Sequence, residues 1–284
     1  MTQLLRGAPV AKQMQEQSAA RVAALVQEGI TPTLALVRVG NRPDDLSYER
    51  GILKRAHEAC VQIQTIMLPQ DCITQDVLDA VVSINKDPHI HGALLFRPMP
   101  HHIDQRAVCA ALDPQKDVDG ITQDSLYGTF ACEPVGFAPC TAEAVIRMLD
   151  FYEVVLEGTQ VAVVGRSLVV GRPLAALLLA RNATPTICHS KTQHLEQVCA
   201  HAQVVVVATG HPQSFSAVGT NAKQVVVDVG IHWDEDAQKL VGDVDFANVK
   251  PIVAAISPVP GGVGSLTTAV LIDHVVTAAE RSIK

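Results

Sequence analysis

Hydrophobic residues follow two alternating patterns along the chain, one with helical spacing and one of short unbroken apolar runs. Val10, Met14, Val22 and Val26 lie at helical spacing, which predicts an amphipathic helix over residues 10–29. The run TLALVRVG at residues 33–40 predicts a buried strand. The alternation continues with predicted helices at residues 47–60, 74–85 and 103–112 and predicted strands at residues 62–68 and 92–96. This order predicts a parallel sheet covered by helices.

A polar, glycine-containing connection at residues 113–136 leads into a second series of the same kind. Its predicted helices are at residues 141–152, 170–182, 194–201 and 265–283, and its strands at residues 160–165, 184–188, 204–209, 224–230 and 252–256. The predicted fold class is therefore α/β, with two lobes and a cleft between them. We expect residues 1–140 and 265–284 to form the first lobe, because the long closing helix can pack back on it, and residues 141–264 the second.

Composition narrows the class of protein. The formal charge is −7 and no Lys/Arg run occurs, which argues against a nucleic-acid or anionic-membrane partner. No apolar stretch approaches the roughly 20 residues of a membrane span, and the first residues are too soon polar for a signal peptide, so we expect a cytoplasmic protein. The seven cysteines form no C-x-x-C and the eleven histidines have no metal-ligand spacing, which favours reduced thiols and no metal site.

The first candidate for chemistry is the turn after the predicted strand QVAVVG. Gly165-Arg166-Ser167 begins this turn, and Gly171 ends it where a helix is predicted to start. Glycines allow a tight turn and a close approach to a pyrophosphate, and the free N–H groups of a helix start attract its charge. The spacing departs from G-x-G-x-x-G, so an ordinary strand-to-helix turn is the alternative interpretation.

The next predicted strand ends at a neutral-to-basic segment that contains Ser190 and Lys191. A Rossmann-type fold places the residue that meets the adenosine ribose at this point, and NAD enzymes usually have Asp or Glu there. A carboxylate would repel a 2′-phosphate, whereas Ser190 and the Arg166 guanidinium can bind one. The sequence therefore favours NADP over NAD. The alternative is a solvated lysine and a serine that is satisfied locally.

Several strings in order resemble the methylenetetrahydrofolate dehydrogenase/cyclohydrolase family over nearly the whole chain. They are KDVDG (116–120), PCTAEA (139–144), VVGRSLVVGRP (163–173), ATPTICHSKT (183–192), VVVDVGI (225–231), GDVDF (242–246) and PVPGGVGSLT (258–267). The resemblance implies a two-lobed homodimeric oxidoreductase of one-carbon metabolism, which serves purine biosynthesis. It also implies NADP on a Rossmann-type second lobe and a tetrahydrofolate substrate on the folate side of the cleft.

The resemblance further implies which residues form the site. It assigns the cofactor to Gly165, Arg166, Ser167, Ser190, Thr192 and Ile231, and the folate to Tyr48, Asp119, Pro260, Gly261, Gly262 and Gly264. As the implied catalytic residues, Tyr48 would stack on the pterin-aminobenzoate and Asp119 would bind the amino-pyrimidine edge. Without the resemblance, Tyr48 is interpreted as a half-buried aromatic residue and Asp119 as a turn former.

Two departures from the family pattern bear on the second activity of its bifunctional members. Those members have a lysine four residues after the tyrosine, on the same helix face, and here Ile52 stands at that position. Lys54 is about 200° further around the helix. The family also has a glutamine where this chain has Phe96, and the neighbouring Arg97 replaces an apolar residue. Arg97 is either a substrate ligand or a solvated side chain.

Hydride transfer depends mainly on positioning, whereas hydrolysis of the methenyl product needs a proton carrier, typically worth about 10²–10⁴-fold in rate. Ile52 and Phe96 cannot carry a proton, so we expect an NADP-dependent dehydrogenase with weak or absent cyclohydrolase activity. One alternative is a bifunctional enzyme that also makes 10-formyltetrahydrofolate, with Lys54, Arg97 or a histidine acting from another direction. The other is a non-catalytic protein that binds NADP or folate.

Overall fold

The computed structural model describes residues 2–235 and 238–283, which divide into two compact lobes. The first lobe comprises Gln13–Cys140 and the chain from Thr268 onward, and the second comprises the residues up to Lys12 and Thr141–Thr267. The C-terminal helix α10 (Thr267–Arg281) therefore belongs almost wholly to the first lobe, as expected. The opening residues differ from the expectation, because β1 (Gln3–Leu4) pairs with a strand of the second lobe.

The first lobe is built on a three-stranded parallel sheet in the order β3-β2-β4. The strands are β2 (Thr33–Val39), β3 (Gln62–Leu68) and β4 (Gly92–Leu95). All seven residues of the central strand β2 are buried. A strand buried on both faces has no polar alternation, which explains the continuous apolar run in the sequence.

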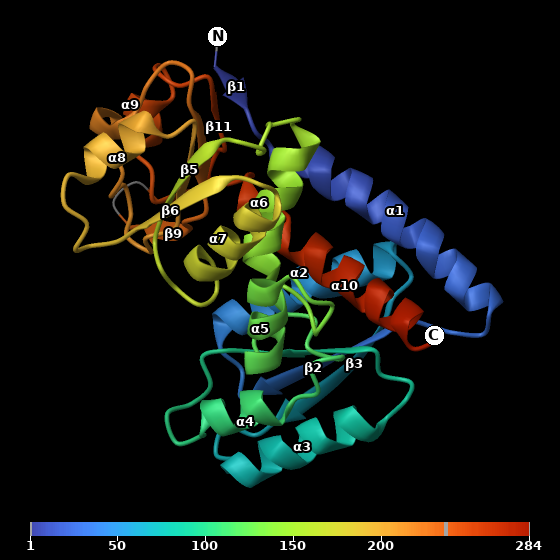
Figure 1. The fold of residues 1–284 in the computed structure, drawn as a ribbon. Helices are drawn as coiled ribbons and strands as arrows, with labels where there is room; N and C mark the ends of the chain where they lie inside the picture. The colour runs from blue at the N-terminus through green and yellow to red at the C-terminus, as the bar shows by residue number, and fades with distance from the viewer. Residues whose placement is uncertain (1, 236–237, 284) are drawn as a thin grey trace. The chain divides into compact units, whose positions relative to one another are not determined.

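Helices cover both faces of this sheet (Figure 1). The helices α3 and α4 lie side by side, and their apolar residues join Ala35, Val37 and Leu95 in one core cluster. α10 packs on the β4 strand, since a Cβ on Gly92 would lie 3.2 Å from Val275. The helices are α1 (Gly7–Gln27, which begins in the second lobe), α2 (Pro43–Glu58), α3 (Thr74–Lys86), α4 (Gln105–Ala111), α5 (Gln123–Ala131) and α10.

The second lobe is built on a six-stranded parallel sheet in the order β1-β11-β8-β7-β5-β6. Its remaining strands are β5 (Gln160–Val164), β6 (Thr184–Cys188), β7 (Val204–Val207), β8 (Val225–Asp228) and β11 (Ala255–Ile256). The chain runs from β5 outward to β6 and then back to β7 on the other side of β5. This reversal is the topological switch point of a Rossmann-type sheet, where ligands bind beyond the carboxyl ends of the strands.

The helices α6 (Cys140–Phe151), α7 (Gly171–Ala180) and α8 (Leu195–His201) of the second lobe follow the predicted alternation, and several short elements add to it. These are α9 (Phe246–Val249), the 3₁₀ turns η1 (Ala217–Gly219) and η2 (Val263–Ser265), and the antiparallel pair β9 (His232–Asp234) and β10 (Lys239–Val241). No helix in the described ranges is both long and apolar enough to cross a membrane.

The hydrophobic pattern missed elements that apolar periodicity does not mark. The segment 113–136, predicted as a connection, contains α5, whose Phe130 is 80% exposed. This helix begins at a local cap, because the Thr122 hydroxyl accepts from the Ser125 amide at 3.1 Å. β1 and the β9/β10 pair were also missed, and the predicted strand at residues 252–256 shortens to the two-residue β11. Two- and three-residue strands are too short to show a period.

Candidate active site

The turn after β5 requires glycine at both of its ends. Gly165 has a φ of +134°, and a Cβ there would lie 2.1 Å from the carbonyl oxygen of Ala208, just beyond β7. A Cβ on Gly171, the first residue of α7, would lie 2.0 Å from the carbonyl oxygen of Gly165. The chain thus makes a turn at the switch point that no other residue allows without a shift, and it brings bare backbone to the edge where a nucleotide binds.

Arg166, Ser167 and Ser190 are exposed around this turn. The amide of Gly165 donates to the carbonyl of Cys188 at 2.9 Å, so the ends of β5 and β6 are tied together. After β6, the amide of His189 donates to the Thr192 hydroxyl at 2.8 Å, which closes a local turn over Ser190. These contacts place the predicted phosphate residues at one edge of the sheet and occupy Thr192 with a structural hydrogen bond.

A pocket of about 240 Å³ lies in the same lobe, beyond the end of β8. Its lining consists of Asp228, Gly230, Ile231, Pro258, Val259, Pro260, Gly261, Gly262, Gly264 and Ser265. The predicted cofactor residue Ile231 thus shares one pocket with the four residues of the glycine-rich loop that were predicted to contact folate. Ile231 is 57% exposed, so its side chain is available to a ligand at this edge.

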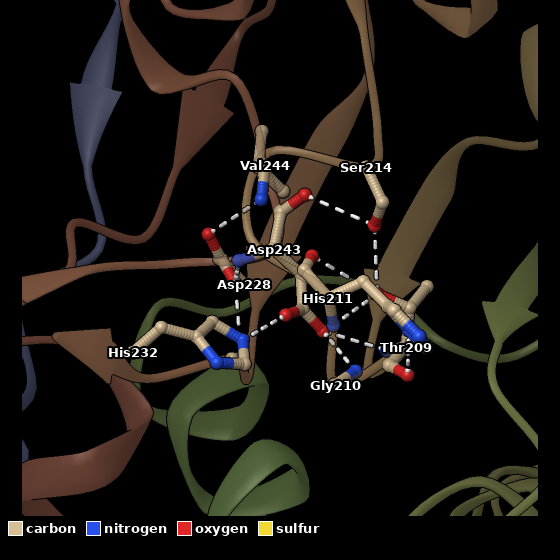
Figure 2. Close-up of polar contacts among 9 residues, drawn as sticks. Thr209, Gly210, His211, Ser214, Asp228, His232, Asp243 and Val244 are labelled. Atoms are coloured by element: carbon tan, nitrogen blue, oxygen red, sulfur yellow. Dashed lines mark hydrogen bonds and ion pairs between the residues drawn. The ribbon is translucent and has the colours of Figure 1, made fainter. Parts of the chain in front are cut away.

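A buried carboxylate supports the wall of this pocket (Figure 2). Asp228, the last residue of β8, accepts from the amides of Gly230, Asp243 and Val244 at 2.9, 3.0 and 3.0 Å. Burial raises the pKa of Asp228 to about 6, although these three backbone hydrogen bonds act in the opposite direction. The carboxylate therefore fixes the backbone just before Ile231 to the segment that follows β10.

A second carboxylate continues this network to the end of β7. Asp243 is fully buried and accepts from the amides of Thr209 and Gly210 at 2.6 and 2.9 Å. Its other oxygen contacts Nε2 of His232 at 2.7 Å (Figure 2). The sequence reasoning missed this network. Its one signal was an aspartate at the end of an apolar strand, the VVVD of β8.

The first lobe holds the remaining predicted residues, beginning with Tyr48 on α2. Tyr48 is 37% exposed, and its ring meets that of Phe96 edge to face at a centroid distance of 6.2 Å. Ile52, one helical turn after Tyr48, is fully buried, whereas Lys54 is exposed on another face of the helix, as helix geometry predicts. Phe96 is also buried, so both of these side chains are apolar and shielded from solvent.

A buried ion pair fixes the helix that carries Tyr48. Arg38 on β2 donates through Nε to Glu49 at 3.0 Å, and their side chains are 4% and 10% exposed. Arg38 also donates to Asn41 at 2.5 Å and to the carbonyl of Gly40. Since Glu49 is the residue next to Tyr48, this pair sets the orientation of α2 relative to the sheet.

Asp119 is paired with Arg97, the residue whose role the sequence left open. Nη2 of Arg97 donates to Oδ2 of Asp119 at 3.0 Å, and the side chains are 27% and 19% exposed. Burial raises the pKa of Asp119, while Arg97 acts to lower it. Arg97 is therefore not a solvated side chain. Sequence reasoning missed this contact because the partners are 22 residues apart in the chain.

The predicted residues thus gather into four groups, each within one lobe: Tyr48 with Phe96 and Asp119 with Arg97 in the first, and the β5 turn and the Ile231 pocket in the second. In the part of the chain that the structure describes, no group of three or more His, Cys, Asp or Glu side chains could hold a metal ion. A glycine turn at a Rossmann switch point, joined in one chain to a second parallel α/β lobe, defines a nucleotide-binding protein with an additional α/β domain.

Comparison with known proteins identifies the family. Residues 5–119 match the catalytic domain of tetrahydrofolate dehydrogenase/cyclohydrolase, and residues 139–283 match its NAD(P)-binding domain. The chain is 46% identical to the bifunctional protein FolD of Carboxydothermus hydrogenoformans over 99% of this chain and 98% of that protein. The chain therefore belongs to the tetrahydrofolate dehydrogenase/cyclohydrolase family, as the sequence strings predicted.

Solved structures agree with this assignment. The bifunctional FolD enzyme of Campylobacter jejuni superimposes with a TM-score of 0.96 at 32% identity, over 99% of each chain. The methylenetetrahydrofolate dehydrogenase-cyclohydrolase of Trypanosoma brucei, solved with NADP and an inhibitor, gives a TM-score of 0.92 at 30% identity, over 100% of this chain and 99% of that one. The predicted two-lobed α/β fold with an NAD(P)-binding domain is thus confirmed.

Proposed function

We propose that this protein oxidises 5,10-methylenetetrahydrofolate to 5,10-methenyltetrahydrofolate with NADP as hydride acceptor, and that it has little or no cyclohydrolase activity. The proposed dehydrogenase activity is supported by family membership together with the glycine turn and the Ile231 pocket. The proposed lack of cyclohydrolase activity is supported by the full burial of Ile52 beside Tyr48, with buried Phe96 against the tyrosine ring.

The residues of the second lobe fit the proposed cofactor. A Cβ at Gly165 or Gly171 would clash with a carbonyl oxygen of the protein itself, so only glycine allows this tight turn, which presents bare backbone to a pyrophosphate. Arg166 and Ser190 are exposed at the same edge, with no acidic residue at either position, and so suit a 2′-phosphate. Bound NADP would supply the nicotinamide carbon that accepts the hydride. In this proposal Ile231 contacts the nicotinamide end.

The proposed folate contacts use the chemistry of the other predicted residues. Tyr48 offers a half-exposed ring for stacking on the pterin-aminobenzoate. An ionised Asp119 accepts hydrogen bonds from the amino-pyrimidine edge. For the loop of Pro260, Gly261, Gly262 and Gly264 we likewise propose a contact with folate, as the family resemblance implies. Loss of a hydride from the methylene carbon leaves a cation that the adjacent nitrogen lone pair stabilises. No proton moves in that step, so these residues need only to bind and orient.

Hydrolysis of the methenyl product makes a further demand. Water must be activated and a ring nitrogen must be protonated, which requires an acid/base group beside the reacting carbon. Ile52 has neither a donor nor an acceptor, and neither has Phe96. The exposed Lys54 lies on another face of the helix. The proposed outcome is that the methenyl product leaves the enzyme unhydrolysed.

Two observations favour a second candidate, a bifunctional enzyme. The relatives named above are bifunctional, and Arg97 brings a cationic group to Asp119. An assay of the purified protein discriminates the dehydrogenase from the bifunctional enzyme. The protein is given methylenetetrahydrofolate with NADP or NAD, and NADPH formation and methenyl decay are followed separately. We expect NADP-dependent oxidation with slow decay. Fast decay that Arg97→Ala abolishes would support the bifunctional candidate, and tight cofactor binding without turnover would support a non-catalytic protein.

We also propose that the protein is a cytoplasmic homodimer whose one-carbon product serves purine biosynthesis, as the family resemblance implies. Light scattering of the purified protein tests the dimer, and a monomer at working concentration would contradict it.

A further inference from the structure

We infer that Arg97 is a positioning residue of the folate site, whose guanidinium holds the Asp119 carboxylate ionised and oriented for the amino-pyrimidine edge of a reduced pterin. This inference rests on the proposed function and deepens it, because it assigns a role to a side chain that the family pattern does not predict. The observation that carries it is the 3.0 Å contact between Arg97 Nη2 and Asp119 Oδ2.

The surroundings of Asp119 explain why its charge needs support. Its side chain is 19% exposed, and the groups that face it are Arg97, Asp117, and Cys140 at the start of α6. The thiol of Cys109 on α4 faces the same cluster. Asp117 is fully buried and uses its two oxygens on the amides of Ile121 and Thr122. Arg97 is thus the one cation facing Asp119 among the described residues, and burial together with Asp117 disfavours the ionised form.

Arg97 has no other role in the described ranges that would compete with this one. Its only hydrogen bond there is the one to Asp119, and its buried Nε has no partner. Burying a guanidinium nitrogen without a hydrogen-bond partner costs free energy. We therefore expect that the contact of Arg97 with Asp119 has a function. The carboxylate, in turn, keeps capacity for a ligand, because an ionised carboxylate has about four acceptor sites, of which Arg97 and the Cys140 thiol occupy two.

The pterin edge makes the ionised state necessary. It presents N–H donors, which an ionised carboxylate accepts. A protonated carboxyl group would place a donor against a donor. Loss of Arg97 should therefore weaken folate binding most at low pH, where Asp119 protonates, and should leave binding near normal at high pH. A merely structural role for Arg97 predicts a loss that does not depend on pH in this way.

The test measures tetrahydrofolate binding by calorimetry from about pH 5 to about pH 9 for wild type, Arg97→Leu and Arg97→Lys. We expect Arg97→Leu to weaken binding by about 10- to 100-fold near neutral pH, with recovery toward high pH. Arg97→Lys keeps the charge but not the planar fork, so it should rescue part of the loss. The matched control is Arg106→Leu, which removes an exposed arginine of α4 and should leave binding unchanged.

A double-mutant cycle shows whether Arg97 acts through Asp119. On an Asp119→Asn background, Arg97→Leu should change folate affinity by less than about threefold, since the group it supports has lost its charge. NADP binding, which depends on the other lobe, should be unchanged in every variant, and the circular dichroism spectrum reports that each variant is folded. A pH-independent loss in Arg97→Leu, or an equal loss on the Asp119→Asn background, would overturn the inference. Wild type that binds tetrahydrofolate but fails to reduce NADP would overturn the proposed function instead.

Discussion

Introducing a lysine at position 52 and a glutamine at position 96 should create a cyclohydrolase and should cost stability. In the double variant Ile52→Lys/Phe96→Gln, a lysine follows Tyr48 by one helical turn and a glutamine replaces the ring 6.2 Å from it. A positioned acid/base contributes about 10²–10⁴-fold, so methenyl decay should accelerate by that factor. Phe96→Gln alone supplies no proton carrier and should leave decay unchanged. Ile52→Met conserves volume and is the matched control.

The burial of the two side chains sets the expected stability cost. Ile52 is fully buried and Phe96 is 6% exposed. Each contributes about 1.5–3 kcal/mol through apolar burial, so the double variant should lose about 3–6 kcal/mol. At about 2–4 °C per kcal/mol for chains of this size, the Tm falls by about 6–24 °C, and decay must be assayed well below it. The reasoning is refuted if a double variant that still reduces NADP hydrolyses methenyltetrahydrofolate no faster than wild type.

Three further predictions concern other parts of the molecule. Arg38→Met leaves Glu49 buried and unpaired, so urea unfolding should show that the free energy of unfolding falls by about 3–5 kcal/mol. The double variant Arg38→Met/Glu49→Leu should recover most of this loss. Equal losses in the two variants would argue against a stabilising ion pair. The pKa of Asp228 is raised to about 6 from its ordinary 3.8. Its contribution to stability is therefore full below about pH 4 and decreases by at most about 3 kcal/mol as pH rises through 6. Relative to Asp228→Asn, wild type should lose stability over this range, and a gain would contradict the assignment. Gly165→Ala should weaken NADP binding at least about tenfold, because its Cβ would lie 2.1 Å from the carbonyl oxygen of Ala208. The control Gly51→Ala has open space around its Cβ, so it should stabilise α2 by about 0.5–1 kcal/mol and leave NADP binding unchanged.

Local patterns in the sequence were enough for the central strands of both parallel sheets and for the glycine turn after β5. β2 and β5 are unbroken apolar runs, and the steric need for glycine at position 165 arises within a short strand-turn-helix segment. The helix α5 escaped prediction because its start depends on a side-chain cap and its apolar residues do not form a buried stripe.

Contacts between distant segments could not be predicted in the same way. The Asp243 carboxylate contacts Thr209 just after β7, more than thirty residues away along the chain. It also contacts His232 at the start of β9, about ten residues away. The partner of Arg97 is likewise set by how the loop after β4 meets the segment before α5. A sequence names such side chains as candidates, but the fold decides which carboxylate meets which cation.

The most direct test of the account follows two signals in one reaction of wild-type protein with methylenetetrahydrofolate and NADP. If the Ile52 and Phe96 positions lack a proton carrier, each NADPH formed should be accompanied by one methenyltetrahydrofolate, which then decays at the rate of the protein-free solution. NADPH formation with rapid release of 10-formyltetrahydrofolate would contradict the proposed loss of cyclohydrolase activity. No NADPH formation at all would contradict the dehydrogenase itself.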